Sequence, residues 1–541
     1  LTVSPAYGQL DTGTISGSIA DASGAAVPGA KVILRNEMTG AAREVMANTQ
    51  GFYTFTLIPS GRYSLRVEQQ GFKSYQRTGL LLQVNQNLNV PITLELGELS
   101  DSVTVTGAPP LVDSSSGVLR ETVDHTRITE LPLNGRNVLQ LQNLLPGAVP
   151  TGSLDQGANT PGFAINGGTG FSNNYSLDGG QYSDAYFNAP LPFPNPDAIQ
   201  EFTIQTNSYS AEFGRNRGAS INAVTKSGTN QFHGGAFEFL RNDVFDARPF
   251  FAAATPDFKR NQFGANIGGP IRKNKTFFFF AWQGTHARGT PNTSTIAVPT
   301  AKMRMGDFSE LTRAIIDPAT GAPYPGNVIP EAQLNATAVQ FLNRFVPLPN
   351  SGQFNLVAPR NQPLDGNQYV GRVDHELGEK DRLYGRYMFT DDASFSPGGD
   401  IEGWGNDQDF RRQSIVLNHT HTFNAAMLNT ATFTFNRVKA LVNPEPRFPW
   451  SDLGSKTPPA APDIVGWTIV SINGYFSTNT GTYWDLARNS FNYDDTLSWQ
   501  RGGHSMKFGA QISRYQVNQI NEYLSQGDFT FDGFVTGDSL A

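Results

Sequence analysis

Strict alternation of apolar and polar residues is the strongest pattern in the C-terminal half of the chain. In LNTATFTFNRV, residues 428–438, Ala431, Phe433 and Phe435 fall on one side of an extended chain, and the threonines and Asn436 fall on the other. Segments within 262–270 and 505–518 repeat this two-residue period. The pattern predicts β-strands with one apolar face and one hydrated face.

Nine such strands are expected from residue 231 onward, and their connections alternate in length. RKNK, GEKD, FNAAM and RGGH are tight connections, whereas the intervening ones run from roughly twenty to eighty residues. An outer-membrane barrel has this asymmetry, because its short turns face the periplasm and its long loops face the exterior. We therefore expect an antiparallel transmembrane barrel wall over residues 231–541, with strands at 231–241, 262–270, 276–286, 367–377, 381–391, 411–422, 428–439, 488–500 and 505–518.

Composition supports a mainly β protein and excludes several classes of function. The 55 glycines and 38 phenylalanines favour strands joined by turns over long helices. No run of about 18 apolar residues occurs, so transmembrane helices are not expected. The absence of cysteine excludes disulfides and cysteine-ligated metals, and a net charge of −7 argues against a nucleic-acid partner.

Residues 12–97 contain short alternating runs separated by Gly, Pro and Asn turns, which predicts a small β-sandwich. The segments GSIADASGAAVPGAKV and GFYTFTLIPSGRYSLRVEQQGF resemble the carboxypeptidase-regulatory-like, or transthyretin-like, domain. A metallocarboxypeptidase places zinc ligands with an H-x-x-E pair. None of the seven histidines has Glu three residues later, so we expect an accessory or binding sandwich and no enzyme; these are His125, His233, His286, His375, His419, His421 and His504.

Residues 108–226 mix a helical-looking segment, RNVLQLQNLLPG, with short strands, which predicts a small α+β domain. The segments INGGTGFSNNYSLDGG and DAIQEFTIQTNSYSAEFGRNRGASINAVTKSGTN resemble the plug domain of TonB-dependent outer-membrane receptors, particularly the Oar-like branch, whose members also carry the N-terminal domain. By itself LDGG is an ordinary Asp-Gly turn. The resemblance implies that Leu177, Asp178 and Gly179 mark the plug, and that Asp178 is not catalytic.

Between these domains, residues 98–107 form an expected linker that contains DSVTVTG. Its β-branched residues favour an extended chain, but no partner strand is evident nearby. A last sandwich strand and a plain linker are the alternatives. The segment resembles the TonB box that precedes such a plug, which implies that it adds as a strand to a sheet of periplasmic TonB. The TonB-binding residues would be Asp101, Ser102, Val103, Thr104, Val105, Thr106 and Gly107.

The number of strands bears on the length of the chain. Eight strands enclose little more than their own side chains, whereas barrels that hold a folded plug have about 22 strands. Nine strands are too few to surround residues 108–226. We therefore expect an incomplete chain that lacks roughly thirteen strands by comparison with the receptor family, and that ends inside an external loop.

Other candidate chemistry is weak. His419 and His421 lie on one face of an expected strand, but no third ligand is near them in the sequence, so no metal site is expected. GGTG at 167–170 lacks the full dinucleotide-binding pattern, and no cofactor is expected. Several aromatic residues could stack on sugars, but a lipid-facing band is the preferred interpretation; they are Phe277, Phe279, Phe433, Phe435 and Trp499.

The resemblance implies a receptor in the bacterial outer membrane that imports a ligand through a plugged barrel. Its partners would be TonB, outer-membrane lipid and an extracellular ligand, whether peptide, oligosaccharide or metal chelate. The loops, especially 287–366, would capture that ligand. The alternative is a non-transporting surface adhesin or glycan-binding β protein whose N-terminal sandwich does the binding.

Overall fold

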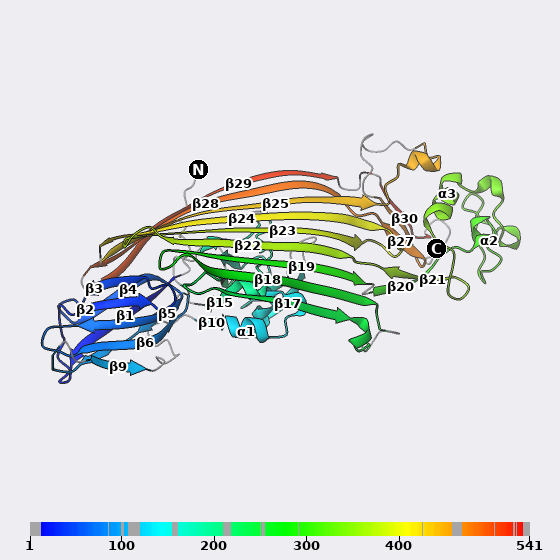
Figure 1. Ribbon diagram of the computed structural model, residues 1–541. Helices are drawn as coiled ribbons and strands as arrows, with labels where there is room; N and C mark the ends of the chain where they lie inside the picture. The colour runs from blue at the N-terminus through cyan, green and yellow to red at the C-terminus, as the bar shows by residue number, and fades with distance from the viewer. Residues whose placement is uncertain are drawn as a thin grey trace.

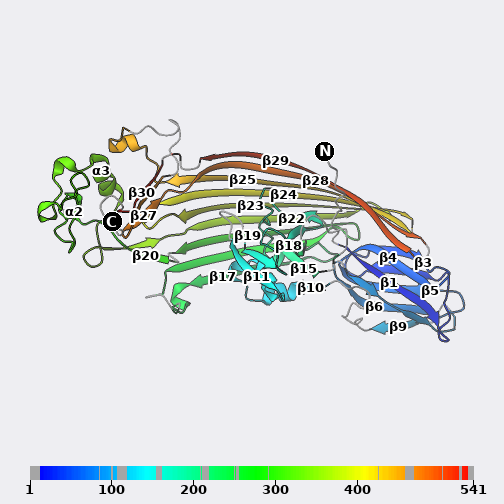
Figure 2. The ribbon, with the colours of Figure 1, turned by 180° about the vertical axis from the view of Figure 1, so that it is seen from behind.

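The computed structural model is almost entirely β. Figure 1 shows a small sandwich at one end of a long curved sheet, a compact domain against the concave side of that sheet, and a group of helices and loops at its other end. Figure 2 shows the same arrangement from behind. The structure describes residues 12–84, 86–98, 102–106, 119–153, 161–184, 186–207, 209, 218–248, 250, 255–289, 292–424, 426–456, 468–501, 504–522, 525 and 527–533.

The N-terminal sandwich has two sheets around one apolar core, as predicted. One sheet has the order β4-β1-β7, with β8 also paired to β1, and the other has the order β3-β2-β5-β6-β9. Alternate residues such as Ile15, Val32 and Leu65 are fully buried between the sheets. The strands are β1 (Thr12–Asp21), β2 (Lys31–Asn36), β3 (Ala42–Met46), β4 (Phe52–Pro59), β5 (Gly61–Glu68), β6 (Ser74–Leu82), β7 (Asn87–Asn89), β8 (Ile92–Leu94) and β9 (Ser102–Thr106).

Strand β9 corrects the expectation that DSVTVTG has no partner strand. It runs parallel to β6, in register from Ser74 with Ser102 to Thr78 with Thr106. DSVTVTG therefore contributes the last strand of the sandwich, which was one of the alternatives to an unpaired segment. Because β9 ends its sheet, its other edge is free of strand partners in the described part of the chain. Asp101 and Gly107 lie outside the described residues.

The compact domain against the curved sheet, which we call the inner domain, covers the described residues from 119 to 225. Its five-stranded sheet has the order β10-β15-β16-β13-β14, and β11 pairs with β12. The expected helical segment forms two 3-10 helices, residues 134–136 and 138–144, instead of an α-helix. The elements are β10 (Leu119–Asp124), α1 (His125–Glu130), β11 (Ala148–Ser153), β12 (Pro161–Ile165), β13 (Asn174–Leu177), β14 (Gly180–Gln181), a 3-10 helix (Pro196–Ala198), β15 (Ile199–Asn207) and β16 (Ser220–Thr225).

The curved sheet, which we call the wall, contains all nine predicted strands in one antiparallel meander. The order is β17-β18-β19-β22-β23-β24-β25-β28-β29, so strands that follow each other in the predicted series are neighbours. The short connections lie at the end nearest the sandwich (Figure 1). The strands are β17 (His233–Asn242), β18 (Phe258–Arg272), β19 (Thr276–Gly289), β22 (Leu364–Glu376), β23 (Asp381–Pro397), β24 (Gly405–Asn424), β25 (Met427–Glu445), β28 (Tyr483–Arg501) and β29 (His504–Glu522).

Side chains of the wall alternate between an inner face, toward the inner domain, and an outward face. In β25, Thr434 and Asn436 are buried and Phe433 and Phe435 are only partly covered, as the alternation predicts. The expectation for Phe277 and Phe279 is wrong, because these rings are 2% and 4% exposed and point inward. The run of four phenylalanines at 277–280 is apolar at every position, so periodicity cannot say which side of this strand faces lipid.

The long connections fold into a small cap at the end of the wall opposite the sandwich. Phe341, Trp404 and Phe448 belong to an apolar core of their own. None of the helices described in the structure is long and apolar enough to cross a membrane. The elements are β20 (Asn292–Ala297), α2 (Ala301–Arg304), α3 (Ala336–Phe345), β21 (Asn355–Arg360), β26 (Ile469–Ile472), β27 (Phe476–Asn479), β30 (Asp528–Phe531) and 3-10 turns at 325–327, 331–333 and 450–453; a further 3-10 turn at 243–245 directly follows β17.

Candidate functional site at the contact between inner domain and wall

The LDGG motif forms the tip of a hairpin that presses against the wall. Strands β13 and β14 are joined by Asp178 and Gly179, whose φ angles are +51° and +71°. Two residues with positive φ form the tight turn that suits a twisted hairpin, and Asp-Gly is a favoured pair for it. A Cβ atom on Gly180 would lie 2.4 Å from Thr434 Oγ1, so glycine permits this close approach.

The carboxylate of Asp178 is fully buried and binds both the inner domain and the wall. Thr225 donates to its Oδ1 from the backbone nitrogen at 2.8 Å and from the hydroxyl at 2.9 Å. From the wall, Arg372 Nη1 donates to Oδ1 at 3.0 Å and Arg386 Nε donates to Oδ2 at 3.1 Å. Tyr384 donates its hydroxyl to the Asp178 carbonyl at 2.6 Å. One turn residue therefore joins strands β16, β22 and β23.

A second buried carboxylate, Asp374, extends this network toward the short-turn end of the wall. Arg372 donates to it from Nε at 2.9 Å and from Nη2 at 3.0 Å, which is the two-pronged geometry that suits guanidinium and carboxylate. Arg382 Nη2 donates to Oδ1 at 3.2 Å. Ser227, just after the inner domain, donates its hydroxyl to Oδ2 at 2.7 Å.

A separate ion pair holds the segment after the hairpin. Arg488 of β28 lies 3.3 Å from both carboxylate oxygens of Asp184. The rings of Tyr186 and Phe187 lie 4.6 and 4.9 Å from the Arg488 guanidinium, within the range of cation–π attraction. Asn436 also donates its side-chain amide to the Gln181 carbonyl at 2.8 Å. These contacts attach the inner domain to wall strands β22, β23, β25 and β28, and hydrogen bonds from Gln262 to Gly135 and from Arg136 to Gln283 add β18 and β19.

Apolar contacts accompany these polar ones. Inner-domain residues such as Leu177 and Phe202 form one buried cluster with wall residues such as Phe279, Val370 and Met388. The two bodies therefore share a core. Movement of the inner domain would expose apolar surface and separate buried charges, and removing one partner from a buried ion pair costs about 3–5 kcal/mol.

The sandwich is also joined to the inner domain, through the buried carboxyl group of Glu201 on β15. The backbone nitrogen of Val84 donates to Glu201 Oε1 at 2.8 Å, and the Thr203 hydroxyl donates to it at 3.1 Å. Burial raises the pKa of Glu201 to about 7, although these hydrogen bonds oppose the shift. The folded state thus binds a proton more tightly than the unfolded state, whose pKa is near the ordinary 4.5.

This shift predicts a sandwich contact that weakens as the pH rises. The stabilisation is complete below about pH 4.5 and is lost as the pH rises through about 7. We expect a loss of about 3 kcal/mol at most across this range. Urea unfolding of the N-terminal domains in detergent at pH 5 and pH 8 measures this loss as a difference in the free energy of unfolding. E201Q should remove the difference between the two pH values, whereas E44Q, at an exposed ion pair, should leave it unchanged.

The sequence located one side of this site and missed the other. Leu177 and Asp178 are completely buried and Gly179 forms the turn, so the expected plug landmark lies at the contact. The wall arginines were not recognised. Arg372 and Arg386 occupy inward-facing positions in strands whose side chains alternate between the two faces. A charged residue at an inward-facing position indicates a buried partner of opposite charge, and this was the signal that could have identified them.

Comparisons with known proteins agree with this architecture. The family model for an outer membrane beta barrel domain matches residues 224–541, and that for a carboxypeptidase regulatory-like domain matches residues 14–95. The TonB-dependent transporter Oar of Myxococcus xanthus is 31% identical over 346 residues, which are 59% of this chain and 31% of Oar. This chain therefore spans less than a third of the length of that relative.

Similar solved structures include the outer membrane transporter YddB from Escherichia coli, with 11% identity and a TM-score of 0.43 over 74% of this chain and 48% of YddB. The siderophore receptor PirA from Acinetobacter baumannii has 12% identity and a TM-score of 0.41 over 73% of this chain and 47% of PirA.

The match over more than half of the chain shows that the protein belongs to the outer membrane beta barrel family. Its resemblance to Oar-like TonB-dependent receptors with an N-terminal carboxypeptidase regulatory-like domain is confirmed, and its location is the bacterial outer membrane.

Proposed function

We propose that this chain forms part of a TonB-dependent importer in which the inner domain is the plug. The cap of long connections meets an extracellular ligand, and the inner domain closes the lumen until TonB pulls on residues 101–107. The observation that carries this proposal is the anchoring of Asp178 by Arg372 and Arg386. A plug must be held firmly enough to seal the barrel, yet through contacts that a mechanical pull can separate.

Strand β9 is the segment on which TonB would pull. One edge of β9 is paired with β6, and no strand among the described residues pairs with its other edge, which suits that edge to strand addition. We propose that TonB adds to this free edge and then draws β9 away from β6. Since β10 follows β9 in the chain and is the first strand of the inner domain, a pull on β9 would be transmitted to the inner domain through β10.

Deletion of residues 101–107 should abolish import and binding of TonB. Cells would be given labelled oligopeptides, oligosaccharides and a ferric chelate, the three ligand classes left open by the sequence. We expect accumulation of one of them to require both TonB and these residues. Binding of purified TonB periplasmic domain to the protein in detergent separates loss of coupling from loss of ligand capture.

A variant with residues 101–107 replaced by a seven-residue Gly-Ser segment keeps the chain length and serves as the control for linker shortening. Import that continues without residues 101–107 would exclude this coupling mechanism. Ligand binding without TonB-dependent accumulation of any probe would favour the alternative of a surface adhesin.

A further inference from the structure

Three potential metal ligands meet on the outward face of the wall near its short turns. Asp381 is the first residue of β23, and His419 and His421 lie near the end of β24. The register pairs Asp381 with His421 and Leu383 with His419. Because His419 and His421 are two residues apart on one strand, both imidazoles project from the same face.

The three side chains converge closely enough for one ion to bind all of them. His419 Nε2 lies 2.9 Å and His421 Nδ1 lies 2.7 Å from Asp381 Oδ1. One ligand atom from each residue lies within 4.8 Å of the other two. The side chains of Asp381, His419 and His421 are 34%, 43% and 31% exposed, so an ion from solution can reach them.

The surroundings place this cluster in a polar belt at the edge of the apolar band. At the same level of the wall, Thr276 is hydrogen-bonded to His375, and Asn429 donates to Asp495. The Phe423 ring packs edge-on against His421 with centroids 4.6 Å apart, as expected for an aromatic residue at a membrane interface. We therefore expect hydrated head groups and water, and not hydrocarbon, around the three ligands.

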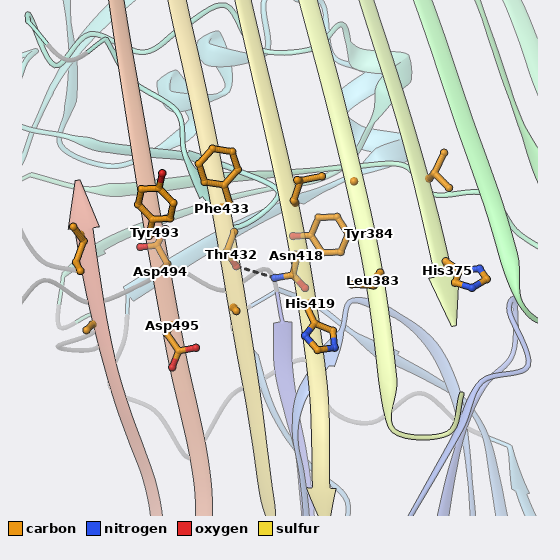
Figure 3. Close-up of a pocket in the computed structure, with 16 residues that line it drawn as sticks. His375, Leu383, Tyr384, Asn418, His419, Thr432, Phe433, Tyr493, Asp494 and Asp495 are labelled. Carbon is orange, nitrogen blue, oxygen red and sulfur yellow. Dashed lines mark hydrogen bonds between the residues drawn. The ribbon is translucent and has the colours of Figure 1, made fainter. Parts of the chain in front are cut away.

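A recess in the wall opens beside the cluster. It has a volume of about 710 Å³ and is lined partly by small residues, Gly385, Ala431 and Ala510, next to larger apolar ones. Figure 3 shows His419 toward one end of this recess and Phe433 and Tyr493 toward the other. The recess leaves room for a water molecule or another ligand to complete the coordination of an ion held by His419.

The donor set selects the class of ion. Two imidazole nitrogens and one carboxylate oxygen suit Zn²⁺ and neighbouring first-row metals, and Zn²⁺ sites with three protein ligands keep a fourth position for water. Bond lengths of about 2.1 Å put the ligand atoms of a tetrahedral site about 3.4 Å apart. The present separations of 2.7 and 2.9 Å require only small side-chain rotations to admit the ion.

We propose that Asp381, His419 and His421 form a zinc site that joins β23 to β24 at the periplasmic edge of the wall. The expectation of no metal site rested on the lack of a third ligand near His419 and His421, and Asp381 supplies that ligand from the neighbouring strand. Metal binding here is independent of the proposed transport function, because none of the three residues contacts the inner domain through a hydrogen bond or ion pair described in the structure.

Zinc binding to the protein in detergent, purified without a histidine tag and stripped with chelator, tests this assignment. We expect one Zn²⁺ per chain at micromolar affinity by calorimetry. The variants D381N, H419N and H421N should each weaken binding by about tenfold or more, since even outer-shell partners of metal ligands contribute that much. Co²⁺ should give the intense visible absorption of a four- or five-coordinate site, and each variant should lose it.

Two histidines outside the cluster provide matched controls. His286 is paired with Asp365 on the outward face but has no second imidazole beside it, and His375 is bonded to Thr276. H286N and H375N should bind Zn²⁺ like the unaltered protein. Absence of micromolar Zn²⁺ binding by the unaltered protein would overturn the assignment, as would equal affinity in the three cluster variants. Circular dichroism of each variant verifies that its β structure is retained.

Discussion

Replacing Asp178 with asparagine is expected to loosen the inner domain from the wall by about 3–5 kcal/mol. Asparagine keeps the shape and can still accept from Thr225, but it removes the charge that Arg372 and Arg386 share. The two guanidinium groups would then be buried with less compensating charge. Hydrogen exchange of the β13 and β16 amides in the detergent-solubilised protein should accelerate, and conductance across planar bilayers should increase.

An Asp-to-Asn substitution at an exposed ion pair is the control. Asp365 contacts Arg288 at 2.7 Å, but both side chains are roughly half exposed, and exposed pairs contribute about 0–1 kcal/mol. D365N should therefore leave exchange and conductance nearly unchanged. If D178N behaves like D365N, the Asp178 network does not hold the inner domain in place. A double variant, D178N with R386M, should recover part of the lost protection, because it removes one of the uncompensated charges.

The wall could be predicted from sequence because its strands obey one local rule. In β25, successive residues face the inner domain and lipid in turn. The polarity of Thr434 and Phe435 therefore predicts which face each occupies, and no information about neighbouring strands is needed. The rule fails where both faces are apolar. Phe279 packs in the apolar core that the wall shares with the inner domain, and Phe277 is buried two residues before it on the same strand. A run of phenylalanines contains no feature that separates this apolar environment from lipid.

Sites that depend on distant residues could be predicted only in part. Asp178 was identified through a motif, but Arg372 and Arg386 are 194 and 208 residues away from it. His419 lies 38 residues from Asp381, and only the register of β23 with β24 brings them together. The pairing of β9 with β6 likewise depends on the sandwich, because β-branched residues favour extension without specifying a partner strand.

The pairing of β9 makes the release of this strand a requirement for import under the proposed mechanism. Gln76 and Thr104 are directly paired on β6 and β9, and the 541 residues contain no cysteine. Paired residues on neighbouring strands lie at a separation that a disulfide can bridge. The variant Q76C with T104C should therefore lock β9 to β6 when oxidised. We expect TonB-dependent import to be abolished by oxidation and restored by a reductant.

A second disulfide shows whether the effect comes from β9 itself. Arg66 on β5 is also paired with Gln76, so R66C with Q76C cross-links the same sandwich but leaves β9 free to move. This variant should import normally in both redox states. The oxidised Q76C and T104C variant should still bind the TonB periplasmic domain, because TonB is expected to use the free edge of β9. Import by the locked protein would exclude release of β9 as a step, whereas loss of TonB binding would mean that TonB displaces β6 instead of adding to the free edge.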